Sequence, residues 1–79
     1  MSVLDINQKI DREKFYQNED QIYRKLNLLL KNKKLFFNIR PSGTEPLLRV
    51  NLQYHKRNIK VKELNNLKIN IIKIISDAC

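Results

Sequence analysis

The stretch that decides the fold is LFFNIRPSGTEPLLRVNLQY, residues 35–54. Apolar side chains alternate with polar ones from Leu35 to Arg40 and again from Leu47 to Tyr54. Such alternation is typical of a β-strand with one buried and one exposed face. The only glycine and both prolines of the chain fall between these two runs, in residues 41–46. The stretch therefore predicts a hairpin whose connecting loop is the one special loop of the chain.

Three further segments have regular patterns on either side of the hairpin. Residues 3–10 place apolar side chains on one parity, which indicates another strand. Residues 19–31 have apolar side chains at helical spacing. Before them, Asn18 and Gln21 have the spacing of a capping box, so Asn18 is predicted to be the N-cap. A second amphipathic helix is expected from Lys60 onward.

The order of these elements predicts the fold class. Strand, helix, strand, strand, helix (β-α-β-β-α), with short connections, favours an α+β domain with an antiparallel sheet and two helices on one face. The 79 residues fit a single small domain spanning positions 1–79. The opposite face of the sheet would be polar, with these side chains on it: Asn38, Arg40, Arg49, Asn51 and Gln53.

The composition limits the classes of function. The net charge of +8 favours anionic ligands. A small basic nucleic-acid-binding module is therefore an alternative. The lysines are scattered and only Phe36 could stack a base on the polar face, and both features argue against it. The single cysteine, Cys79, excludes an internal disulfide and fits a reducing compartment. No stretch is apolar enough for a membrane span, so a cytoplasmic location is expected.

The loop and the arginines flanking it have the residue types that hold a phosphate group. Arg40 and Arg49 supply charge and paired N–H donors. Ser42 and Thr44 add hydroxyl donors. Gly43 would allow successive backbone N–H groups to converge as an anion nest. These residues predict a phosphate site, although Ser-Gly-Thr is also ordinary turn chemistry.

The expected strand geometry supports the same interpretation. Arg40 and Arg49 would lie close together across the hairpin, on the polar face. Two like charges side by side are unfavourable unless an anion bridges them. Pro41 and Pro46 would stiffen the ends of the loop and lower the entropy lost on binding.

The run from Arg40 to Val50, RPSGTEPLLRV, resembles the phosphate-binding loop of the α-D-phosphohexomutase superfamily, which includes phosphoglucosamine mutase, phosphomannomutase and phosphoglucomutase. The order of elements over the whole chain is similar to that family's C-terminal domain, with phosphoglucosamine mutase closest. The resemblance implies a TATA-binding-protein-like fold. It also implies that the following positions contact the phosphate of a phosphosugar: Arg40, Ser42, Gly43, Thr44 and Arg49. Glu45, with Pro41 and Pro46, would shape the loop, and its carboxylate would turn away to bond backbone N–H groups or an arginine.

The resemblance also implies what the chain lacks. The family moves a phosphoryl group between the 6- and 1-positions of a hexose through a phosphoserine, with Mg²⁺ held by aspartates and a separate sugar-recognition loop on other domains. None of these is recognisable here, and His55 is expected in an exposed loop, so no catalytic or metal-binding residue is predicted. The chain alone is expected to bind a phosphosugar without turning it over.

The expected partners follow from the same resemblance. They are a phosphosugar and the remaining mutase domains, in cis or in trans. An excised domain, a gene remnant and a split subunit are all compatible with the sequence. A third possibility is a structural fragment that docks onto the rest of a split mutase through Leu47 and the exposed sides of its helices.

Overall fold

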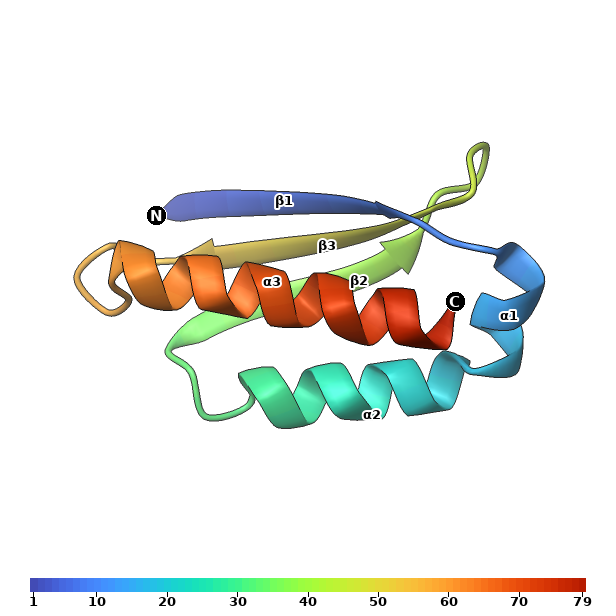
Figure 1. Cartoon of the computed structure of the whole chain (residues 1–79). Helices are drawn as coiled ribbons and strands as arrows, with labels where there is room; N and C mark the ends of the chain where they lie inside the picture. Colours follow the sequence, from blue (N-terminus) through green and yellow to red (C-terminus); the bar gives the residue numbers. More distant parts are fainter.

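In the computed structural model, which describes all 79 residues, the chain forms one sheet and three helices. Strands β1 (Ser2–Lys9), β2 (Leu35–Pro41) and β3 (Leu47–Tyr54) pair antiparallel in the order β1-β3-β2. Helices α2 (Glu19–Leu30) and α3 (Val61–Ala78) cover the same face of this sheet (Figure 1). The predicted α+β fold, with both of these helices on one side, is confirmed.

The core lies between the sheet and the two long helices. Because side chains alternate along a strand and recur every 3.6 residues along a helix, each element turns one apolar set inward. The fully buried set comes from the three helices and the central strand: Phe15 of α1; Ile22, Leu26 and Leu30 of α2; Leu48, Val50 and Leu52 of β3; Ile71 and Ile75 of α3. The transfer of each such side chain from water to the core contributes roughly 1.5–3 kcal/mol to the free energy of unfolding. No polar side chain is buried, so the polar face of the sheet is left to solvent.

A short helix that the sequence analysis missed connects β1 to α2. Helix α1 (Arg12–Gln17) begins where the Asp11 carboxylate accepts a hydrogen bond from the Lys14 backbone N–H at 3.3 Å. Phe15 anchors this helix, because its ring is fully buried in the core. Helix α1 sets the position of the β1–α1 connection, which contacts the loop described below.

The predicted capping box at Asn18 is wrong. Asn18 does precede α2, but its side chain makes no capping hydrogen bond. Its backbone N–H already closes α1 by bonding the carbonyls of Lys14 and Phe15. The Asn18 amide instead donates to the backbone carbonyl of Ala78 at 2.9 Å, which ties the start of α2 to the end of α3.

The surface charges have few partners within the chain. The single ion pair joins Lys33 Nζ to Glu63 Oε1 at 3.2 Å. Of the 16 Lys and Arg side chains, all except Lys33 therefore have no ion-pair partner within the chain. Two titratable groups near the core have shifted pKa values: burial raises the pKa of the Tyr23 phenol and that of the Cys79 thiol.

The helices do not combine the length and the apolar character that a membrane-spanning segment needs.

Candidate functional site

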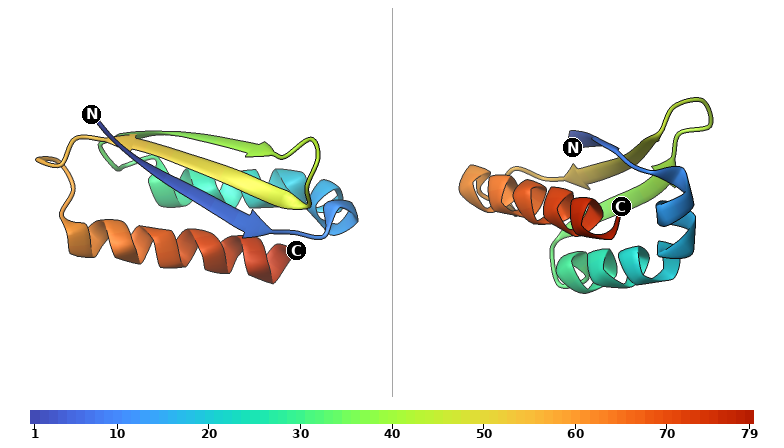
Figure 2. Two further views of the ribbon diagram at one scale, coloured as in Figure 1. Left: turned by 90° about the horizontal axis from the view of Figure 1, so that it is seen from above. Right: turned by 45° about the vertical axis from the view of Figure 1, so that its right-hand side comes forward.

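The loop that joins β2 to β3 stands at one end of the sheet. It projects beyond the strands, away from α2 and α3 and at the same end of the molecule as α1 (Figures 1 and 2). In the hairpin register, Arg40 of β2 lies directly opposite Arg49 of β3. The sequence prediction that these two arginines lie side by side is therefore confirmed by the strand pairing.

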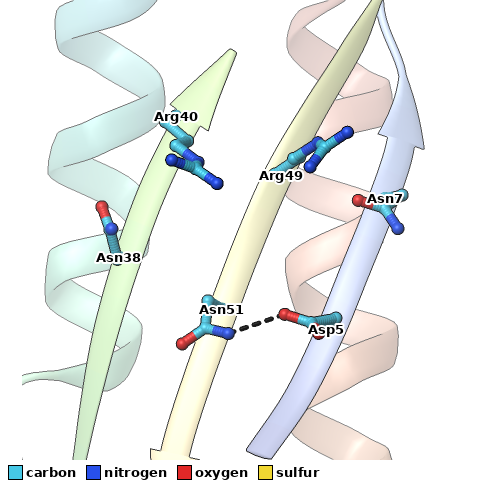
Figure 3. A pocket seen from close by; sticks show the side chains of 6 residues that line it. All are labelled: Asp5, Asn7, Asn38, Arg40, Arg49 and Asn51. Carbon is cyan, nitrogen blue, oxygen red and sulfur yellow. Dashed lines mark hydrogen bonds between the residues drawn. The ribbon is translucent and has the colours of Figure 1, made fainter. Parts of the chain in front are cut away.

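Both arginine side chains rise from the open face of the sheet, with the helices behind it (Figure 3). Neither guanidinium takes part in any side-chain hydrogen bond or ion pair of the chain. Like charges directly opposite each other destabilise a strand pair. Arg40 and Arg49 thus form an uncompensated cationic pair, and their ten N–H donors have no protein partner.

The loop bonds to itself in this structure. Ser42 Oγ accepts hydrogen bonds from the backbone N–H groups of Thr44 (3.4 Å) and Glu45 (3.3 Å). No residue has a positive φ, Gly43 included, so these two successive N–H groups converge on one oxygen without left-handed backbone at Gly43. A serine hydroxyl commonly accepts from nearby backbone N–H groups in this way. An atom added at the Gly43 Cβ position would meet nothing within 4 Å apart from its neighbours in the chain, so the space beside the loop is open.

The predicted phosphate-contacting residues lie around one shared hollow. Its volume is about 290 Å³, and the lining residues are Arg40, Pro41, Ser42, Gly43, Thr44 and Arg49. These include every position that the resemblance assigned to phosphate contact. Glu45 and Pro46 do not line the hollow. Four polar side chains and Gly43, from two strands and one loop, therefore line one open hollow.

Glu45 holds the loop differently from what was expected. Its carboxylate makes no hydrogen bond or ion pair with backbone or arginine. The contact with an arginine is made instead by its backbone: Arg12 Nη2 donates to the Glu45 carbonyl at 3.0 Å and to the Ser42 carbonyl at 3.3 Å. The loop's geometry is thus fixed through its carbonyls rather than through the acidic side chain.

Arg12 is the residue of the site that sequence reasoning missed. It opens α1 and reaches across 30 positions of sequence to Ser42. Nearby, the backbone N–H of Ile10 donates to the Pro46 carbonyl at 2.9 Å. The β1–α1 connection therefore supports both halves of the loop. No local sequence signal marks this role, because it depends on which segments the fold brings together.

A larger groove continues from the two arginines along the open face of the sheet. Its volume is about 430 Å³ and no apolar residue lines it (Figure 3). The lining side chains come from all three strands: Asp5 and Asn7 of β1, Asn38 and Arg40 of β2, and Arg49 and Asn51 of β3. The groove and the loop hollow share Arg40 and Arg49, so they form one continuous concave surface.

The acidic and histidine side chains of the chain do not fit a Mg²⁺ site. Nowhere do three or more His, Cys, Asp or Glu side chains lie close enough to hold a metal ion. His55 is exposed just beyond the end of β3 that is remote from the loop.

A cationic pair and two hydroxyl side chains at one end of the sheet, on a two-layer α+β scaffold, define the class of protein: a small α+β domain with a polar, basic sheet surface. The chain belongs to the family described as phosphoglucomutase/phosphomannomutase, C-terminal domain, which it matches over residues 6–66. The match covers more than half of the chain and includes the whole hairpin and its loop. It confirms the superfamily resemblance. A comparison with curated proteins finds no match.

Proposed function

We propose that Arg40, Arg49 and the loop between them bind the phosphate group of a phosphosugar. In this proposal the chain is the phosphate-binding domain of a phosphohexomutase, of the phosphoglucosamine mutase kind. The observation that carries it is the cross-strand pair of arginines with no carboxylate partner, beside a loop of donors. The family to which the chain belongs supports the same function.

Each group around the hollow has a role in the proposed complex. The guanidinium groups of Arg40 and Arg49 neutralise the dianion and donate in pairs to its oxygens. The Ser42 and Thr44 hydroxyls donate to the remaining oxygens. The N–H groups of Thr44 and Glu45, now bonded to Ser42 Oγ, exchange that weak acceptor for a charged phosphate oxygen. Charge-assisted hydrogen bonds of this kind are roughly twice as strong as neutral ones.

The loop would orient the substrate rather than react with it. In a complete mutase this domain would hold the phosphate that is not being transferred, and so place the sugar for reaction at its other end. Catalytic groups and Mg²⁺ would come from other mutase domains, in cis or in trans. The isolated chain therefore binds its ligand without turnover.

An amide-resolved NMR titration tests the proposal. Glucosamine 6-phosphate, inorganic phosphate and a short single-stranded oligonucleotide are added separately to the full chain. Both phosphates should shift the amides of residues 42–45, most strongly those that now bond Ser42 Oγ. Arg40→Ala should abolish these shifts. Arg57→Ala is the matched control, since Arg57 is exposed and lies beyond the far end of β3, roughly 25 Å from the loop along the strand.

Two outcomes would overturn the proposal. One is the absence of any response to either phosphate in the unchanged chain. The other is an equal loss in Arg57→Ala and Arg40→Ala, which would mean that net charge and not the arginine pair attracts the anion. Shifts spread over the lysines with the oligonucleotide alone would favour the nucleic-acid alternative, particularly with a steep dependence on salt.

A further inference from the structure

Six side chains line the groove beside the loop, and the strand register arranges them in two rows. The first row across the sheet is Asn7, Arg49 and Arg40, and the second is Asp5, Asn51 and Asn38 (Figure 3). The rows are two residues apart on every strand, which corresponds to roughly 7 Å. The first row carries the two cations. The second row, called the amide row below, carries two carboxamides and one carboxylate.

The amide row has both hydrogen-bond donors and acceptors without partners. Asn51 Nδ2 donates to Asp5 Oδ1 at 2.6 Å, and Asn51 Oδ1 accepts from Gln53 at 3.4 Å. These bonds leave the second carboxylate oxygen of Asp5 and the second N–H of Asn51 free. The carboxamide of Asn38 makes no hydrogen bond at all with another side chain or with backbone. A sugar hydroxyl needs such a mixture, because it both donates and accepts.

The position of Asp5 limits the orientation in which an anionic ligand can lie in the groove. A carboxylate repels phosphate, so a phosphosugar can bind along the groove only with its phosphate at the first row and a neutral part over the amide row. A phosphodiester strand running along the same face would bring negative charge against Asp5. The groove is therefore complementary to an anionic head followed by a neutral polyol.

We propose that the amide row, Asp5, Asn51 and Asn38, binds the hydroxyl groups of a hexose whose phosphate lies at Arg40 and Arg49. This inference rests on the proposed phosphate site, which fixes one end of the ligand. The sugar ring then lies along the strands over the sheet, and the sheet face contributes to recognition of the sugar as well as of its phosphate. The Asp5 carboxylate accepts from a hydroxyl, and the Asn38 carboxamide donates to and accepts from its neighbours.

The test compares glucose 6-phosphate with inorganic phosphate on the full chain, by NMR titration. In the unchanged chain the hexose phosphate should bind roughly 5–10-fold more tightly, as one or two net hydrogen bonds give. Its shifts should extend from the loop to the strand amides around Asp5 and Asn38. Asp5→Ala should abolish the preference for glucose 6-phosphate over inorganic phosphate, while the affinity for inorganic phosphate rises slightly because a repelling carboxylate is removed. Asn38→Ala, at an exposed position of β2, gives a second variant with the same expected loss.

Val3→Ala is the control, because Val3 lies on the same face of β1 one row beyond the groove and is 54% exposed. It should leave both affinities unchanged. Equal binding of the two ligands by the unchanged chain, with shifts confined to the loop, would overturn the inference and leave the phosphate site intact. Absence of binding by both ligands would overturn the phosphate site and the amide row together.

Discussion

At the scale of single residues, Arg40 and Arg49 stand out because they oppose the stability of the hairpin that carries them. They face each other directly across β2 and β3, and neither has a carboxylate within ion-pair distance. A strand pair stabilised only for folding would place opposite charges or apolar groups at this position. An anion bound between the two guanidinium groups would offset their repulsion. Without a ligand, that repulsion should be measurable as a lower free energy of unfolding.

We predict that Arg40→Gln raises the free energy of unfolding by about 0.2–1 kcal/mol while it weakens phosphate binding. Glutamine keeps part of the side-chain stem and a polar end, so mainly the repulsion with Arg49 is removed. Urea unfolding at low salt without phosphate measures the change. Arg24→Gln, an exposed change of the same type on α2, should alter stability less. A loss of stability in Arg40→Gln would mean that the cationic pair is not strained in the free chain.

The residue scale also shows where sequence reasoning ends. The positions of Arg40 and Arg49 could be predicted because alternation along a strand is a local rule. The role of Arg12 could not, since its partners Ser42 and Glu45 lie 30 and 33 positions away. The same holds for Asn18, whose side chain bonds a carbonyl 60 positions further on. The local sequence shows that Asn18 could cap α2. It does not show that the folded chain brings the Ala78 carbonyl next to the Asn18 side chain as a competing partner.

At the scale of elements, the sequence predicted those segments whose burial pattern is long and regular. Strand β3 is central, with alternate side chains buried against the helices, and its predicted bounds, Leu47 to Tyr54, are those observed. Helix α1 was missed because its six residues are too few to repeat an apolar pattern. It is held by the single buried ring of Phe15 and by the Asp11 cap.

The packing of α2 gives a test at this scale. Leu26 is fully buried against the sheet, whereas Leu28, on the same helix, is 60% exposed. We predict that Leu26→Ala lowers the free energy of unfolding by about 2–5 kcal/mol, through lost burial and an unfilled cavity. Leu28→Ala makes the same chemical change on the outer side and should alter it by less than about 0.5 kcal/mol. Urea denaturation of both variants measures the difference, and similar losses would contradict the observed orientation of α2.

At the scale of the whole molecule, net charge couples folding to ligand binding. The chain carries +8 with a single internal ion pair, so its charges repel one another in the folded state. The same positive field attracts anions towards the loop. Simple salt should therefore stabilise the fold by screening this repulsion, while it weakens the attraction for phosphate.

A specific anion should stabilise the chain further than screening alone does. Sulfate resembles phosphate in shape and charge, and an anion that binds only the folded state adds about 1.4 kcal/mol at roughly ten times its Kd. We predict that sulfate raises the melting temperature more than chloride does at equal ionic strength. Sulfate also stabilises proteins generally, by exclusion from their surfaces, so Arg40→Gln is the necessary control. The advantage of sulfate over chloride should shrink in that variant and persist in Arg57→Gln. An advantage of the same size in all three chains would show that sulfate acts as a bulk salt, and that Arg40 and Arg49 do not form an anion site in the free chain.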